Sequence, residues 1–234
     1  MKKMVLGLIW LSLSVHAAGV YATFTVEAKR HADLAFTTTG TVAKVHVDIA
    51  DEVHQGEVLT ALKNDDLKAA LKVAQVALEY ARRDYERQKR VKKLVDAAQL
   101  DKYAFKYEHA KAQVAYQQAL LDKTLLKAPF DGVVYAKMVE VGDVVSGAMI
   151  RTVMKVESRH ARKLIVSFDQ KYWHRVKKGD RFIYHFDGGD KEYEGRISKI
   201  YPTIDPKSRK AKAEVEVSDI PTGLFGTGTI AVGH

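Results

Sequence analysis

The stretch GTVAKVHVDIADEVHQGEVL, residues 40–59, decides the fold of this chain because its pattern returns far downstream. The second copy is GVVYAKMVEVGDVVSGAMI, residues 132–150. An ungapped alignment of residue 40 with residue 132 gives these identical pairs: Gly40 and Gly132, Val42 and Val134, Val47 and Val139, Asp51 and Asp143, Val53 and Val145. The repeat indicates two copies of one supersecondary unit. Two unrelated hairpins in an all-β domain are the alternative.

Both copies predict a strand, a tight turn, a second strand and a glycine turn. β-branched residues alternate with other residues in each copy, which favours short strands. They are Val45, Val47 and Ile49 in the first copy and Val139 and Val141 in the second. The turns follow at Ala50-Asp51 and Gly142-Asp143, because glycine accepts a positive φ and aspartate binds nearby backbone amides.

The residues between the copies predict a helical hairpin. Residues 65–124 contain no Gly and no Pro and are rich in good helix formers. Asn64 or Asp65 is expected to cap the first helix. Apolar residues recur at steps of three and four, as in a coiled coil: Leu67, Leu71, Ala74, Leu78, Ala81 and Tyr85, then Leu100, Tyr103, Tyr107, Ala110, Val114 and Leu121, with Gln117 in the same series. We expect a projecting two-stranded coiled coil, with two helices packed on a globular core as the alternative.

The turn of this hairpin lies in LVDAAQLD, residues 94–101. Asp96 is expected to cap the second helix, with Gln99 at the capping-box position. Just before the turn, ARRDYERQKRVKKL, residues 81–94, is strongly basic. A basic run is either a solvated face or a docking surface. An exported chain is a poor candidate for nucleic-acid binding.

The N-terminus predicts export. A basic start, MKKM, precedes the apolar run VLGLIWLSLSV, and residues 20–22 (VYA) fit the last positions before a cleavage site. Residues 15–17 (VHA) offer a second site. A retained membrane anchor is the alternative, although the run is shorter than the ~20 apolar residues that cross a bilayer.

Composition is that of a globular protein, with 47% hydrophobic residues and a formal charge of +9. Such a charge is compatible with nucleic acid, an anionic membrane or an acidic protein partner. The absence of cysteine excludes disulfides and thiolate zinc sites. No catalytic motif and no helix-face histidine pair is present. Met138, Met149 and Met154 could bind copper, but methionine in strands is more often core filler. We therefore expect no enzyme activity, no cofactor and no bound metal.

The two half-motifs resemble the biotinyl/lipoyl domain, a flattened barrel of two quasi-symmetric halves. In carriers of that family a hairpin with an exposed lysine joins the halves. Here KNDDLKAAL, residues 63–71, leads into a helix instead. A carrier role is therefore disfavoured.

A lipoyl-like domain split by a helical hairpin resembles the periplasmic adaptor, or membrane-fusion, family (HlyD-like). Three pieces carry the resemblance: the return LKAPFDGVVYAKMVEVGDVV, the turn LVDAAQLDK, and a C-terminal region that includes IDPKSRK. That region reads as strands, with a short helix and a turn at residues 178–180. It is similar to the β-barrel domain of RND efflux adaptors. The run Gly223-x-x-Gly226-x-Gly228 lacks the context of a dinucleotide fingerprint.

The resemblance implies an elongated modular protein of mixed α and β class. We expect a leader at 1–22, an N-terminal strand region at 23–38, lipoyl halves at 39–63 and 126–158 around a hairpin at 64–125, and a β-barrel at 159–234. It implies a periplasmic location near the inner membrane, a ring of three or six copies, and contacts with an inner-membrane transporter and an outer-membrane channel. Arg90, Leu94 and Asp96 are the nearest matches to the channel-contacting Arg, Leu and Ser of the family, with Asp96 in place of the Ser. Arg87, from the basic run, is expected to contact the channel beside them. An adaptor of an ABC exporter and an exported biotinyl/lipoyl carrier are the alternatives.

Overall fold

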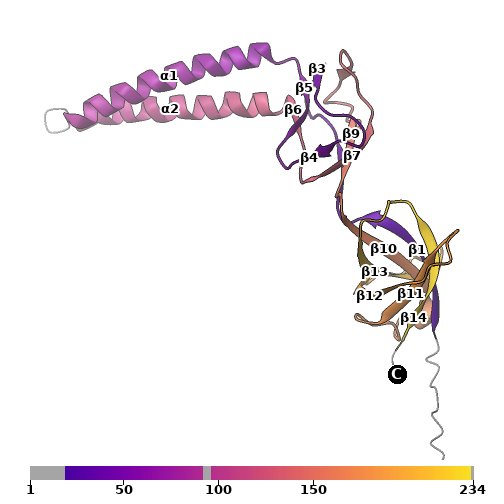
Figure 1. Cartoon of the computed structure of the whole chain (residues 1–234). Helices are drawn as coiled ribbons and strands as arrows, with labels where there is room; N and C mark the ends of the chain where they lie inside the picture. The colour runs from indigo at the N-terminus through magenta and orange to yellow at the C-terminus, as the bar shows by residue number, and fades with distance from the viewer. Residues whose placement is uncertain (1–18, 92–95, 233–234) are drawn as a thin grey trace, which may run out of the picture. The chain divides into compact units, whose positions relative to one another are not determined.

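The computed structural model describes residues 19–91 and 96–232. The described chain forms two units (Figure 1). One comprises residues 30–159, and the other joins the chain up to Lys29 with the chain from His160. The mixed α and β class, with a split lipoyl-like domain, an inserted pair of helices and a β-barrel, is confirmed.

The barrel unit is a closed sheet of six antiparallel strands in the order β1-β10-β13-β12-β11-β14. The strands are β1 (Val20–Ala28), β10 (Ala161–Asp169), β11 (Arg181–Phe186), β12 (Tyr193–Ile200), β13 (Lys210–Ser218) and β14 (Phe225–Ala231). Inward and outward residues alternate along each strand, as a barrel with one buried face requires. Phe24 lies at the centre of the core, with its ring centroid 5.1 Å from that of Tyr184 and 5.9 Å from that of Phe182.

Strand β1 corrects two expected domain boundaries. The sequence predicts residues 20–22 in the leader and residues 23–38 in a separate N-terminal region. Instead residues 20–28 pair with both β10 and β14, and Val20 and Ala22 lie in the barrel core. The physical reason is closure, because the barrel needs a strand between β10 and β14 to leave no open edge.

The glycine run at the C-terminus serves the packing of β14 on β11. A Cβ on Gly228 would overlap the carbonyl oxygen of Ile183, and one on Gly226 would overlap that of His185. Only glycine allows β14 this close approach. The glycine run is therefore part of a barrel strand rather than of a nucleotide site.

The other unit contains two four-stranded sheets, β2-β9-β7-β4 and β6-β5-β3-β8. Their strands are β2 (His31–Leu34), β3 (Gly40–Val45), β4 (Glu52–Val53), β5 (Val58–Leu62), β6 (Leu125–Lys127), β7 (Gly132–Lys137), β8 (Val144–Val145) and β9 (Met154–Glu157). The inner faces bury a shared core that includes Val42, Leu59, Val134 and Met154. Met154 is completely buried, as expected of core filler, whereas Met138 and Met149 are exposed and depart from that expectation.

The two sequence copies exchange strands. Gly40 in the first copy pairs with Val145 in the second. The equivalent residues of the other copies, Gly132 and Val53, pair in the same way. Thus β3 pairs with β8 while β7 pairs with β4, and neither half closes its own sheet. The repeat indicated one domain built by two mutually dependent halves, and this pairing is its physical basis.

The turns of the two copies also match bond for bond. The Asp51 carboxylate accepts a hydrogen bond from the amide of Asp48 (2.7 Å), and the Asp143 carboxylate accepts one from the amide of Glu140 (2.8 Å). Ala50 and Gly142 occupy the same left-handed position, with φ of 74° and 99°. These turns begin earlier than expected, because β3 ends at Val45 and β7 at Lys137.

Residues 46–49 and 138–141 are therefore loops, and their apolar residues divide in the same way in both copies. Val47 and Val139 are buried, whereas Ile49 and Val141 are exposed. Alternation identified the buried positions but not the end of the strand.

Lys137 joins the two turns. Its Nζ lies 2.9 Å from Glu140 Oε1 and 3.3 Å from Asp48 Oδ1, which occupy equivalent positions in the two copies. The hydrogen bonds to Glu140 and then to Asp48 raise the pKa of Lys137. One lysine thus links the two halves across their pseudo-twofold axis.

The hairpin consists of α1 (Asp65–Arg90) and α2 (Ala97–Asp122). Asn64 occupies the N-cap position of α1, but its side chain makes no capping hydrogen bond. Instead its Nδ2 donates to Thr124 Oγ1 (2.9 Å), and the Thr124 hydroxyl donates to the carbonyl of Leu121 (2.6 Å). The buried amide therefore joins the two ends of the hairpin at its base.

Candidate functional site

The two helices pack through the expected apolar series. Every residue of the predicted stripes is buried or half-buried, including the polar Gln117. Leu71, Ala74 and Leu121 near the base are the most buried. Farther out, the rings of Tyr85 and Tyr107 stack with centroids 5.7 Å apart and planes 5° apart. Figure 1 shows the helices side by side up to the turn.

Asp96 caps α2 as the sequence indicates. Its side chain accepts a hydrogen bond from the amide of Ala98 (3.5 Å), and its carbonyl accepts one from the amide of Gln99 (3.0 Å). In the described part of the chain, the Gln99 side chain makes no reciprocal bond to complete the capping box. The Asp96 carboxylate is exposed beside the turn, so capping leaves it accessible to a partner.

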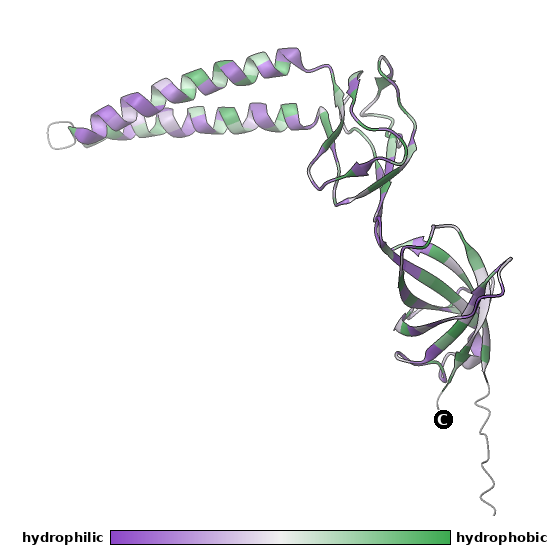
Figure 2. Cartoon of the chain, in the orientation of Figure 1, coloured by the Kyte–Doolittle hydropathy of each residue, from purple (hydrophilic) through white to green (hydrophobic). Residues whose placement is uncertain are grey.

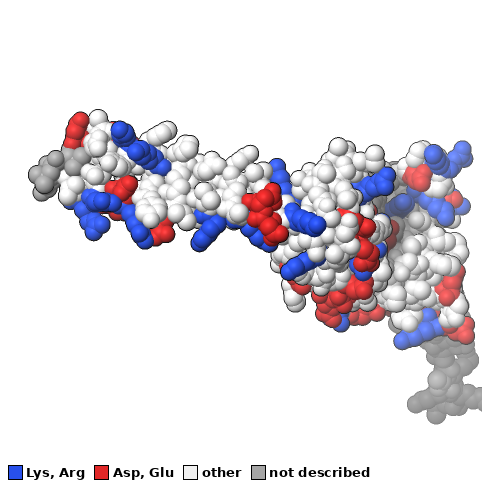
Figure 3. All heavy atoms as spheres, turned by 90° about the horizontal axis from the view of Figure 1, so that it is seen from above, with Lys and Arg blue, Asp and Glu red and all other residues white. Residues whose placement is uncertain are grey.

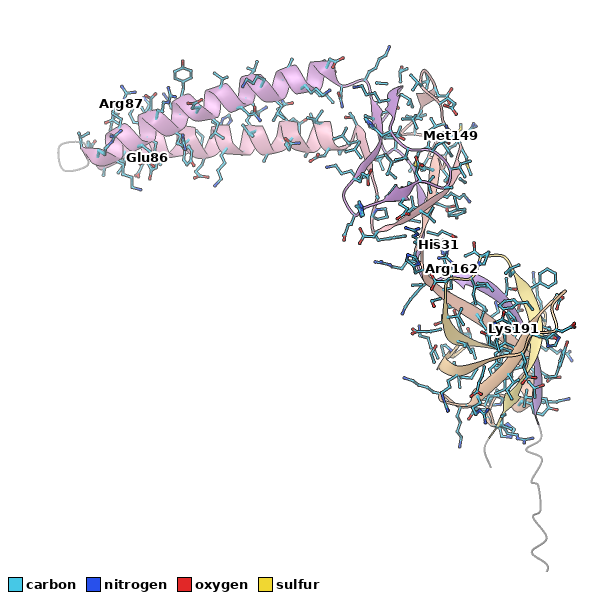
Figure 4. All side chains as sticks on the ribbon, in the orientation of Figure 1. His31, Glu86, Arg87, Met149, Arg162 and Lys191 are labelled. Carbon is cyan, nitrogen blue, oxygen red and sulfur yellow. The ribbon has the colours of Figure 1, made fainter. Side chains whose placement is uncertain are left out.

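Arg87 and Arg90 lie in the last turn of α1. Figure 4 shows Arg87 near the tip. Arg87 Nη2 donates to Asp84 Oδ1 (2.6 Å), whereas Arg90 Nε reaches only the carbonyl of Glu86 (3.4 Å). Cations at the C-terminal end of a helix are favoured by its dipole. Leu94, the remaining predicted contact, lies outside the described residues, as do Lys92 and Lys93.

The basic run is thus partly neutralised within the helix. Arg83 pairs with Glu79 and Arg87 with Asp84. Both pairs are exposed and contribute little to stability. In Figure 3 blue side chains gather near the tip with red ones among them. The tip therefore presents charges of both signs with a basic excess. Such a surface suits a partner whose contact surface has an acidic excess.

The sequence reasoning missed a second apolar series on each helix, directed away from the partner helix. On α1 it comprises Val73 (71% exposed), Val76 and Tyr80 (64% exposed). On α2 it includes Phe105 (71% exposed) and Tyr116. Figure 2 shows hydrophobic residues along both helices. On α1, the steps of three and four between these positions are the signal that could have revealed it.

Such side chains are normally avoided on a solvated arm. An amphipathic helix in water keeps one apolar stripe, against its core, and a polar opposite face. Here each helix carries apolar residues on both faces. We refer to Val73, Val76 and Tyr80 as the outer stripe of α1, and to Phe105 and Tyr116 as the outer stripe of α2.

The lipoyl-like unit carries a smaller exposed apolar group. Met138, Val144, Met149 and Ile150 are all more than half exposed, and a cavity of about 510 Å³ lies between Met138, Val144 and Met149. Met149 Sδ accepts a hydrogen bond from Arg151 Nη2 (3.4 Å), and Figure 4 labels Met149. Among the described residues, no group of three or more His, Asp or Glu side chains could hold a metal ion.

Comparison with known proteins agrees with this geometry. Residues 30–155, which form the lipoyl-like unit and its hairpin, match the family described as CzcB-like, barrel-sandwich hybrid domain. The chain belongs to this family of periplasmic adaptors. The cobalt-zinc-cadmium resistance protein CzcB of Cupriavidus metallidurans is 25% identical over 198 residues, which are 77% of this chain and 38% of the relative. The chain thus spans well under half the length of that relative.

Solved adaptor structures share the fold. A MacA–MexA chimera carrying the Pseudomonas aeruginosa MexA α-hairpin superposes with a TM-score of 0.82 at 20% identity, covering 92% of this chain and 79% of the chimera. ZneB of Cupriavidus metallidurans superposes with a TM-score of 0.61 at 18% identity, covering 92% and 71%. The adaptor fold therefore extends over both units of the chain. No helix in the described parts of this adaptor is long and apolar enough to cross a membrane.

Replacing Asp96 with Ala is expected to destabilise the first turn of α2 by about 1 kcal/mol, because the amide of Ala98 loses its acceptor. Asp96→Ser should retain most of the cap. Hydrogen exchange at residues 97–100 measures the effect. The matched control is Asp101→Ala, which removes the same charge from an exposed position within the helix. Equal exchange in both alanine variants would show that Asp96 does not stabilise the tip.

Proposed function

We propose that this adaptor links an inner-membrane transporter, of the RND type, to an outer-membrane channel in a tripartite efflux system. The observation that carries the proposal is the position of the hairpin. It joins the two lipoyl halves at Leu62 and Leu125, where a carrier would hold its lysine. The arm is built for contact with other proteins, since it has apolar faces beyond its own core.

The outer stripes support assembly into a ring. A subunit in a closed ring needs two interfaces, one for each neighbour. Val73, Val76 and Tyr80 would contact one neighbouring hairpin, and Phe105 and Tyr116 the other. The ring would leave the tip, with Arg87, Arg90 and Asp96, free to pack on helices of the channel. We propose three or six copies, as in the expectation from the family.

Divalent metal cations are the substrates that we propose to test first. The support is the name of the CzcB relative from Cupriavidus metallidurans, which is given for cobalt, zinc and cadmium resistance. Growth of a deletion strain on each metal, with and without the gene restored, provides the test. Equal growth with and without the gene would remove that metal from the list.

Reversing the charge of both Arg87 and Arg90 to Glu is expected to weaken channel association by roughly tenfold or more, because two charge contacts become repulsive. Co-purification of the channel with the adaptor from membranes measures this. The matched control is Lys72→Glu with Lys111→Glu, which changes the net charge equally on exposed residues nearer the base. Unchanged association in the Arg variant would sink the assignment of the tip.

Processing after Ala17 is expected, rather than after Ala22. Val20 and Ala22 are buried in the barrel core, and Val20 pairs with Ile230 of β14. Cleavage after Ala22 would remove both, and a buried valine alone contributes about 1.5–3 kcal/mol. The intact mass of exported protein should match a chain that begins at Ala18. A chain beginning at Thr23, or an unprocessed chain, would contradict this.

A further inference from the structure

One end of the barrel combines exposed apolar side chains with an excess of positive charge. At this end β1 begins, β10 ends and β13 begins, since Ala22 pairs with Phe168 and Asp169 pairs with Lys210. Two connections cover it, residues 170–180 and residues 201–209. The opposite end carries residues 29 and 160, through which the chain passes to the other unit. We call the first end the basic end of the barrel.

Its apolar residues are held in exposed positions. Trp173 is 62% exposed and follows the short 3-10 helix η2 (Gln170–Tyr172), with its amide bonded to the carbonyl of Gln170. Val176, three residues on, is buried in the barrel core and fixes the segment. Tyr21 and Ile204 are also exposed. The segment therefore presents an indole ring to the solvent at this end of the barrel.

Basic residues are frequent in the same two connections and at the start of β13. They are Lys171, Arg175, Lys177, Lys178, Lys207, Arg209 and Lys210. Of these, Lys171 pairs with Asp169 at 3.8 Å. Within residues 19–91 and 96–232, none of the other six has an acidic side chain within ion-pair distance. Most of the positive charge of this end is therefore available to a ligand.

The acids at this end are engaged with backbone amides. Asp169 accepts from the amide of Lys171 (2.9 Å), Asp180 from that of Lys177 (2.7 Å) and Asp205 from that of Lys207 (2.8 Å). Bonds to the amides of Lys207 and Ser208 lower the pKa of Asp205. The carboxylates thus shape the loops, while Lys177, Lys178 and Lys207 are exposed.

We propose that the basic end of the barrel binds an anionic lipid surface. Trp173 would insert at the level of the headgroups, and Lys177, Lys178, Lys207 and Arg209 would contact lipid phosphates. Tryptophan and tyrosine beside lysine and arginine are the side chains that settle at a membrane–water interface. Basic residues near the surface add attraction to anionic lipids.

The course of the chain favours a membrane over an acidic protein. The apolar run of residues 5–15, with Lys2 and Lys3 before it, precedes β1 by a few residues. The chain enters the barrel at the basic end, at Gly19 and Val20. The basic end is therefore the end of the barrel closest in sequence to the apolar run, and this supports a lipid surface as its ligand. The proposal concerns the barrel alone and does not depend on channel docking by the hairpin.

The test uses the intrinsic fluorescence of Trp173 in the exported chain that begins at Ala18. Trp10 is the only other tryptophan and lies in the segment that processing after Ala17 removes, so Trp173 is the sole reporter. We expect vesicles of phosphatidylcholine with phosphatidylglycerol to shift its emission to the blue, with quenching by lipids brominated near the headgroup. Vesicles of phosphatidylcholine alone should produce a much smaller effect. An emission unchanged by the anionic vesicles would overturn the proposal and leave an acidic protein face as the ligand.

Charge reversal tests whether this end of the barrel makes the contact. In the chain that begins at Ala18, Lys177→Glu with Lys178→Glu should lower the vesicle-induced shift of Trp173 several-fold. Lys72→Glu with Lys102→Glu, on exposed faces of the hairpin, changes the net charge equally and should leave the shift unchanged. Equal shifts in the two double variants would overturn the proposal.

Discussion

Replacing Phe24 with Ala is expected to lower the free energy of unfolding of the barrel by about 3–5 kcal/mol. The side chain is 2% exposed, and its ring meets the rings of Phe182, Tyr184 and Phe186 edge to face, with centroids 5.9, 5.1 and 5.3 Å away. Truncation would leave a cavity and also remove the aromatic pairs. Denaturant unfolding followed by near-ultraviolet circular dichroism measures the loss.

The matched control is Tyr21→Ala on the same strand. Tyr21 is 65% exposed, and its side chain points out of the barrel. A surface substitution of this kind usually changes stability by about 0.5 kcal/mol or less. If both variants were equally stable, β1 would not contribute side chains to the barrel core, and the domain boundary at Lys29 would be wrong.

Placing aspartate at Val73 and Tyr80 is expected to abolish efflux while leaving the hairpin folded. Both residues lie on the outer stripe of α1, so the packing of α1 on α2 should persist. In a ring the new carboxylates would be buried against a neighbouring subunit without partners, and an unpaired buried charge costs several kcal/mol. Resistance of the host to exported compounds, together with helical circular dichroism of the purified chain, measures the two effects.

Lys72→Gln with Gln75→Asp provides the control for this variant. It changes the net charge by the same amount on exposed positions of the same helix. Normal resistance is expected, because these residues lie outside the outer stripe. Normal resistance in the Val73 and Tyr80 variant as well would show that the stripe makes no necessary contact.

The lipoyl-like unit could be predicted because its sequence repeats. The glycine, valine and aspartate pairs fall at positions where the two copies exchange strands, so symmetry in the sequence reports symmetry in the sheet. The hairpin could be predicted from heptad steps, because two packed helices bury apolar residues at alternating steps of three and four. Both the repeat and the spacing of apolar residues are visible in a single sequence without knowledge of contacts between distant segments.

The features that were missed depend on contacts between distant segments. Strand β1 alternates clearly at residues 20–28, but it follows an apolar leader, and its partner β14 lies at the other end of the chain. The outer stripe was overlooked because Val73, Val76 and Tyr80 follow the same steps as the inner stripe beside them. Ile49 and Val141 continue the alternation of a strand but lie in turns, where the Asp51 and Asp143 carboxylates bind the backbone instead.

The central claim is that the hairpin tip contacts an outer-membrane channel, and crosslinking from a single cysteine tests it most directly. The chain has no cysteine, so Glu86→Cys places one reactive group near the tip and Lys191→Cys places one on the barrel (Figure 4). Both side chains are exposed. In cells that contain the whole system, the account predicts a crosslink from residue 86 to the channel, and none from residue 191. A channel crosslink from residue 191 with none from residue 86 would contradict it.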